Sequence, residues 1–188
     1  MTRILLQFLN APLFALLVLV GVALQSSLFN SQPLIYFQPD LVLLAVIWCG
    51  LERDFLEGGI LTLIFSYFAE LHSSAPRGLI AVDYMLMYLT TRLVIRLLVI
   101  PNRASLIMMT MGASILAKLI NWATLWQLGA AEGHWRHLLI YVFPGALAEG
   151  LAAYVIYRLF ERFDWHTYKN ARARNLLEDE LLLEGEGY

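Results

Sequence analysis

Five ionisable residues lie inside long apolar segments of this 188-residue chain, and they are the first candidates for chemistry. They are Glu70, Asp83, Arg92, Lys118 and Glu149. A charge in an apolar helix is costly, so such residues mark ion or proton paths, polar ligand sites or structural ion pairs. Because both signs occur at similar depths, the pattern favours structural pairs over a path through the protein.

The expected helix ends divide these charges into two layers. A rise of about 1.5 Å per helical residue places Glu70, Asp83 and Lys118 in the outer half, and Arg92 and Glu149 together in the inner half. We therefore expect Glu70 or Asp83 to approach Lys118, and Arg92 to share a neutralising cluster with Glu149.

Other motifs give weaker indications of metal binding or catalysis. His134 and His137 are three residues apart and His72 lies in another loop, but this spacing does not gather three ligands. Gly112-Ala113-Ser114 resembles the surroundings of an intramembrane serine nucleophile, but no His lies in another apolar core to serve as its base. We therefore predict no catalytic residue, no metal and no cofactor.

The elements that position these residues follow from the composition. Hydrophobic residues make up 60% of the chain and charged residues 15%, against about 45–50% and about 25% in soluble domains. The net charge of −2 gives no basic footprint for nucleic acid. Cys49 is the only cysteine, which excludes an intrachain disulfide framework. The composition indicates an all-α integral membrane protein.

Six apolar segments are separated by turns with Pro, Gly or charges, and we predict a transmembrane helix for each. The segments are Ile4–Leu28, Pro39–Leu51, Gly58–Leu71, Leu79–Ile100, Ala104–Leu128 and His137–Phe160. The first resembles a signal peptide, but its apolar run is long and its cleavage site poor, so we expect it to be retained. Residues 1–160 then form the membrane domain, and residues 161–188 form a polar, acidic cytoplasmic tail.

The basic residues orient this bundle. With the N-terminus inside, two arginines fall on the outer side, Arg77 and Arg136. Ten basic residues fall on the inner side: Arg3, Arg53, Arg92, Arg96, Arg103, Arg158, Arg162, Lys169, Arg172 and Arg174. Such an excess of inner positive charge predicts six spans with both termini in the cytoplasm.

Small residues recur at helical spacing on three of the segments. They are Gly59, Thr62 and Ser66, then Ala113 and Ala117, then Ala146 and Gly150. Small residues let helix backbones approach closely, within one bundle or between proteins. Packing within the chain is the preferred interpretation, and a partner's membrane helix is the alternative.

Three stretches of the chain carry short motifs that occur together in one family of membrane proteins. The first is the Gln38-Pro39-Asp40 entry to the second helix. The second runs from Gly58 through Glu70 to the turn at Ser73–Gly78. The third is the closing helix, which ends Tyr157–Arg162. With these motifs the chain resembles the MreD family, the rod-shape-determining membrane proteins of bacteria. The resemblance covers nearly the whole chain, with Glu70 where the family commonly has Asp.

The resemblance implies a non-enzymatic scaffold in the bacterial cytoplasmic membrane, within the cell-elongation complex that builds sidewall peptidoglycan. Its implied partners are an MreC-like bitopic protein, MreB-like filaments, a RodA-like glycosyltransferase and a class B penicillin-binding protein. The family fold is also similar to the six-helix substrate-binding subunits of ECF transporters, so the alternative is a small-molecule-binding transporter subunit.

We expect a partner helix to dock on a surface near the start of the chain. This predicted partner face comprises Pro12, Gly58, Gly59, Thr62 and Arg77. Its small residues would permit the close helix contact that association in lipid requires.

Overall fold

The computed structural model describes residues 2–28, 38–73, 75–97, 103–129 and 134–167, and the described part is helical without strands. The helices are α1 (Thr2–Leu28), α2 (Leu41–Glu52), α3 (Phe55–Leu71), α4 (Leu79–Leu97), α5 (Arg103–Gln127) and α6 (His134–His166). The all-α class and the six helices predicted from the sequence are thus confirmed. Most of the predicted acidic tail, from residue 168 onward, lies outside the described residues.

Helix α2 forms the centre of the bundle. Its nine residues from Val42 to Gly50 are all buried, as expected for a helix that is apolar on every side. It contacts the other five helices. Asp40 caps its first turn, since Oδ1 accepts a hydrogen bond from the Leu43 amide at 2.9 Å.

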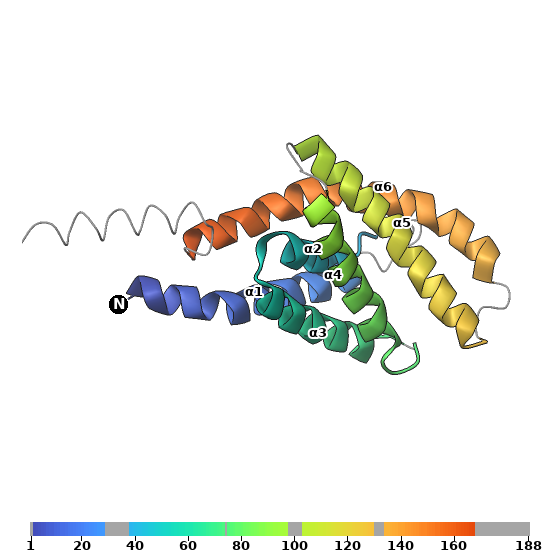
Figure 1. The fold of residues 1–188 in the computed structure, drawn as a ribbon, viewed down its shortest axis with the longest axis horizontal. Coiled ribbons are helices and arrows are strands. Elements are labelled where there is room, and N and C mark those ends of the chain that lie inside the picture. Colours follow the sequence, from blue (N-terminus) through green and yellow to red (C-terminus); the bar gives the residue numbers. More distant parts are fainter. Residues whose placement is uncertain (1, 29–37, 74, 98–102, 130–133, 168–188) are drawn as a thin grey trace, which may run out of the picture.

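Four of the remaining helices surround α2 as two pairs, and α1 packs against α2 and α3 (Figure 1). α3 and α4 pack against one another and against α2, whereas α5 and α6 form a long antiparallel hairpin. The beginning of α1 and the end of α6 lie at the same end of the molecule, where Asn10 contacts Asp164. Aromatic rings fill the space between these helices, with Phe14 and Phe160 4.9 Å apart and Trp48 stacked on Tyr157 at 5.6 Å.

The boundary of the helical domain differs from the sequence-based expectation. Helix α6 is 33 residues long and continues past Phe160 to His166. Asp164 and Thr167 are buried, so the stretch that was predicted to begin the polar tail belongs to the bundle. Helix α3 likewise begins at Phe55, three residues before the predicted start. Buried polar contacts of Asp164 and Thr167 accompany the extension of α6 into a segment whose charges suggested a loop.

Large apolar side chains cover much of the outer surface of the bundle. Those more than half exposed include Leu16, Ile60, Leu93, Met108, Leu151 and Val155. Within the described residues, one helical segment, Ser105–Gln127, is by itself long and apolar enough to cross a membrane. Leu9–Gln25 and Leu41–Glu52 are apolar but shorter.

Gly58 permits the close approach of α3 to α4. A Cβ atom there would lie 2.8 Å from Tyr88 Oη and 3.0 Å from the carbonyl oxygen of Cys49. A Gly58→Ala change is therefore expected to lower the free energy of unfolding by about 1–3 kcal/mol through overpacking. Gly112 is the matched control, because a Cβ there meets nothing within 4 Å. Gly112→Ala should stabilise α5 by up to about 1 kcal/mol.

Thermal unfolding of both variants in detergent measures the difference. Equal unfolding temperatures would contradict the close contact between α3 and α4.

Candidate functional site

A buried cluster joins α1, α2, α6 and the α2–α3 turn at the end of the molecule where α1 begins. We call it the Arg53 cluster, and it comprises Asn10, Trp48, Arg53, Asp164 and Thr167. Arg53 Nη2 lies 2.5 Å from Asp164 Oδ1, with the arginine side chain fully buried. Trp48 Nε1 donates to the other carboxylate oxygen at 3.1 Å. A charged pair at this depth is stable only when its partners are hydrogen-bonded in this way.

Asn10 completes the cluster from α1. Its Oδ1 accepts a hydrogen bond from Arg53 Nη1, and its Nδ2 donates to Asp164 Oδ1 at 3.1 Å and to Thr167 Oγ1 at 2.5 Å. The Arg53 guanidinium also lies 4.9 Å from the ring centroid of Phe14, within the range of a cation–π contact. The cluster therefore holds three segments that are far apart in the sequence.

Arg92 reinforces the α2–α3 turn from α4. Its Nη2 donates to the carbonyl oxygen of Arg53, and its Nε donates to Tyr88 Oη at 3.2 Å. Tyr88 Oη in turn donates to the carbonyl oxygen of Phe55 at 2.7 Å. The predicted cluster of Arg92 with Glu149 is thus wrong, because Arg92 reaches the end of α2 instead of the interior of α6.

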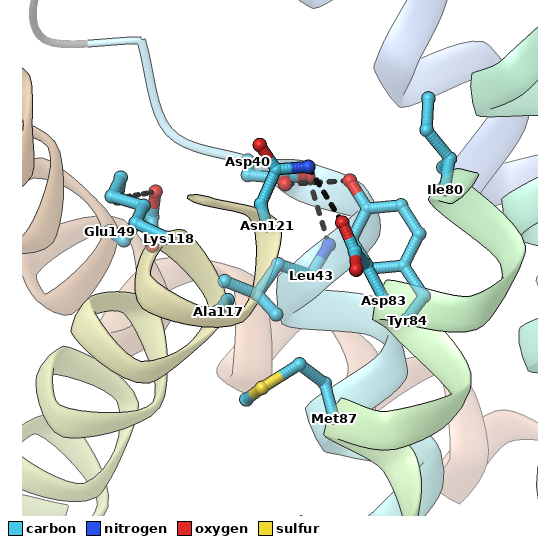
Figure 2. A pocket seen from close by; sticks show the side chains of 10 residues that line it. All are labelled: Asp40, Leu43, Ile80, Asp83, Tyr84, Met87, Ala117, Lys118, Asn121 and Glu149. Atoms are coloured by element: carbon cyan, nitrogen blue, oxygen red, sulfur yellow. Dashed lines mark hydrogen bonds and ion pairs between the residues drawn. The ribbon is translucent and has the colours of Figure 1, made fainter. Parts of the chain in front are cut away.

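A second polar region lies between α2, α4, α5 and α6, around a partly open cavity of about 270 Å³ that we call the polar pocket. Its polar lining residues are Asp40, Asp83, Tyr84, Lys118, Asn121 and Glu149. Figure 2 shows Lys118 and Glu149 on one side of this space and Asp83 and Tyr84 on the other. Apolar side chains, Met87 among them, complete the lining.

Lys118 and Glu149 form an ion pair across the α5–α6 contact. Lys118 Nζ lies 2.8 Å from Glu149 Oε1 and 2.6 Å from Ser114 Oγ. The Lys118 side chain is 26% exposed, whereas that of Glu149 is 3% exposed. Lys118 thus forms its ion pair with Glu149 and with neither Glu70 nor Asp83, although Asp83 lines the same pocket. The depth of Glu149 was misplaced because α6 extends farther than its apolar residues indicate.

Asp83 and Asp40 are held by neutral donors. Asp83 accepts hydrogen bonds from Asn121 Nδ2 at 2.6 Å and from Thr124 Oγ1 at 3.0 Å. Asp40 Oδ2 accepts from Tyr84 Oη at 2.7 Å. No arginine or lysine side chain among the described residues forms an ion pair with either carboxylate.

Glu70 lies apart from the polar pocket, at the end of α3. Its Oε1 accepts a hydrogen bond from the Gly78 amide at 2.6 Å. Gly78 has a positive φ of 87°, which glycine adopts without strain. Glu70 thus closes the turn between α3 and α4, and this contact explains its position better than a role in a buried charge layer.

The predicted partner face does not form one exposed surface. Gly58 and Thr62 are buried against neighbouring helices, whereas Pro12 and Arg77 are exposed and Gly59 is partly buried. Thr62 also satisfies its hydroxyl locally by donating to the carbonyl oxygen of Gly58 at 2.8 Å. The exposure expected for the small-residue part of this face is wrong, because α4 covers it.

The other small residues also pack inside the bundle. Ala146 and Gly150 are buried, and a Cβ on Gly150 would lie 2.4 Å from Met111 Cγ on α5. Ala113 and Ala117 pack against the core. The preferred interpretation of these residues, packing within the chain, is confirmed.

Sequence reasoning missed Asn10, Asp164 and Asn121 as parts of these clusters. Asn10 lies in an otherwise apolar segment, which is a usable signal, whereas Asp164 resembles one of several charges near the chain end. The position of Asp40 was also recognisable from the sequence, because an Asp just before an apolar run is a typical helix N-cap.

Ser114 and Lys118 could be taken for a nucleophile and its base, since serine–lysine pairs occur in hydrolases. Here the amine group of Lys118 is engaged by the Glu149 carboxylate, whereas a general base needs a free lone pair. Ser114 is also fully buried within α5. The arrangement therefore serves to neutralise charge at a helix contact. The clustered His, Cys, Asp and Glu residues needed for a metal are likewise absent from the described ranges.

No family model matches the chain, and no curated protein and no solved structure shows significant similarity to it.

Proposed function

We propose that this chain is a multi-pass protein of the bacterial cytoplasmic membrane, with six spans and both termini in the cytoplasm. The observation that carries this proposal is the distribution of polar and apolar side chains. Polar groups pair with one another inside the bundle, as Arg53 does with Asp164 and Lys118 with Glu149, whereas its outer surface is largely apolar. Lipid supplies no hydrogen bonds, so a bundle within it must satisfy its polar groups internally.

The orientation of the bundle rests on the distribution of positive charge. Ten basic residues lie on the proposed inner side and two on the outer side. The contact between Asn10 near the start of α1 and Asp164 near the end of α6 agrees with both termini lying on one side. A reporter fused after Tyr188 should therefore report the cytoplasm, and one inserted within Gly129–Trp135 should report the outside. An outside signal from the Tyr188 fusion would contradict six spans.

Within the membrane, we propose that the protein acts as an MreD-like scaffold of the cell-elongation complex. Two of the motifs that carry the resemblance have defined contacts. Asp40 of the first motif caps α2 and accepts a hydrogen bond from Tyr84. Glu70 of the second closes the turn at Gly78. These contacts indicate that both motifs help to hold the helices in place. A structural role for the motifs is expected of a scaffold, which acts through its surface.

The test is co-purification of partners with the full chain in mild detergent. We expect an MreC-like protein and a class B penicillin-binding protein among the captured proteins. Arg77 lies exposed in the outer turn, so Arg77→Glu should reduce capture of a partner that contacts this turn. Arg162→Glu is the matched control, because Arg162 is exposed on α6 near the opposite end of the molecule. Capture of an ECF-type ATPase module instead would favour a transporter subunit over a scaffold.

A further inference from the structure

We propose that the polar pocket binds a small organic molecule with one positively charged amine or guanidinium group. The pocket is a partly open cavity of about 270 Å³ enclosed by α2, α4, α5 and α6. Ligand sites in proteins typically enclose about 300–1,000 Å³, and this cavity lies just below that range, so it suits a very small ligand. The proposed scaffold function does not require such a site.

The sign of the ligand follows from the charges that line the cavity. Among the described residues, three carboxyl groups line it, those of Asp40, Asp83 and Glu149, and Lys118 is the only basic one. Glu149 uses one oxygen to pair with Lys118. In the part of the chain that the structure describes, Asp40 and Asp83 accept hydrogen bonds from neutral side-chain and backbone donors alone. The lining therefore carries more carboxylate than cation, and a positively charged group would balance it.

Glu149 provides a second, independent observation that points to a ligand. Its residue is 2% exposed, and its Oε2 atom is buried without a hydrogen-bond partner. A buried carboxylate oxygen without a donor is costly, and such atoms call for an explanation in a native structure. Glu149 lines the pocket, so a donor group bound there would lie beside this carboxylate.

An organic cation fits the pocket better than a metal ion. A metal requires several ligating side chains around one point, and in the described part of the chain three or more His, Cys, Asp and Glu residues do not gather in this way. The remaining lining is apolar and comes from Leu43, Ile80, Met87 and Ala117. Figure 2 places Met87 and Ile80 away from the Lys118–Glu149 pair, where they can contact a short aliphatic body.

The test compares three probes of one size and different charge: n-butylammonium, 1-butanol and n-butyrate. Each is titrated into the purified full chain in a non-ionic detergent at constant ionic strength, and binding is followed by calorimetry and by the unfolding temperature. A ligand that binds the folded state raises that temperature. We expect n-butylammonium to bind and stabilise, and the other two to bind at least tenfold more weakly.

Two conservative variants locate the site. Glu149→Gln and Asp83→Asn each remove a charge with little change in shape, and each should weaken n-butylammonium binding about tenfold. Glu161→Gln is the matched control, because Glu161 lies on the same helix as Glu149 but is exposed, and it should bind as the parent does. If Glu149→Gln does not fold, Asp83→Asn decides the result.

Three results would overturn the proposal. The first is absence of n-butylammonium binding to the folded parent protein. The second is equal or tighter binding of 1-butanol or n-butyrate, which would show that positive charge is not recognised. The third is unchanged binding in the folded variants of Glu149 and Asp83.

Discussion

An Asp164→Ala variant is expected to lose about 3–5 kcal/mol of its free energy of unfolding, the cost of breaking a buried ion pair from one side. The change leaves the guanidinium of Arg53 fully buried and without its closest anion, 2.5 Å away in the parent protein. Trp48 Nε1 loses its acceptor, and Asn10 Nδ2 loses one of two. Three helices are therefore weakened by the removal of one carboxylate.

Titration of the purified protein with a denaturing detergent, followed by tryptophan fluorescence, measures this loss. Glu161→Ala is the control, because Glu161 lies three residues earlier on α6 and is exposed, and it should change stability by less than about 0.5 kcal/mol. The double variant Arg53→Met with Asp164→Leu should recover part of the loss, since it removes both charges of the Arg53–Asp164 pair, while Glu57, 20% exposed, loses its ion pair with Arg53. Equal stability of Asp164→Ala and Glu161→Ala would contradict the buried cluster.

Lys118→Met should also destabilise the protein, by about 2–3 kcal/mol. The change leaves the Glu149 carboxylate almost fully buried with no hydrogen bond from Lys118. The loss is smaller than the about 3–5 kcal/mol of a fully buried pair, because the Lys118 side chain is 26% exposed and the pair is partly screened by solvent.

A change of the other partner, Glu149, distinguishes the contributions of the two residues to stability. Glu149→Gln should cost less than about 1 kcal/mol, because its amide oxygen can still accept from Lys118 and the exposed part of Lys118 can be hydrated. The double variant Lys118→Met with Glu149→Gln should be more stable than Lys118→Met alone. The same denaturing titration checks this order of stability, and a larger loss in Glu149→Gln than in Lys118→Met would contradict it.

The six helices could be predicted from the sequence because long apolar runs and their Pro, Gly and charged boundaries are local signals. The pairing of the charges could not be predicted in the same way. Depth was counted from the ends of the apolar runs, and α6 continues beyond its run to His166 because Asp164 has buried partners on other helices. Because the end of α6 was placed too early, the predicted depth of Glu149 matched that of Arg92 instead of that of Lys118, its actual partner.

The sequence also could not predict which faces of the helices with small residues point into the bundle and which point outward. Glycine, alanine and threonine permit close contact with any helix, so their spacing does not identify the neighbour. In the structure Gly58 faces Tyr88 and Gly150 faces Met111, and both contacts depend on how α4 and α5 are placed. Asn10 illustrates the same limit, because its partner Asp164 is 154 residues away.

The separation of Arg53 from Asp164 has a consequence for biosynthesis. The two residues are 111 positions apart, and the ribosome adds about 5–20 residues per second. Arg53 is therefore made about 6–22 s before Asp164, whereas its other acidic partner, Glu57, follows it by four residues. Helix α2, only 12 residues long, also precedes most of the helices that enclose it. Translation of the last helix thus supplies the final buried partner of the Arg53 cluster.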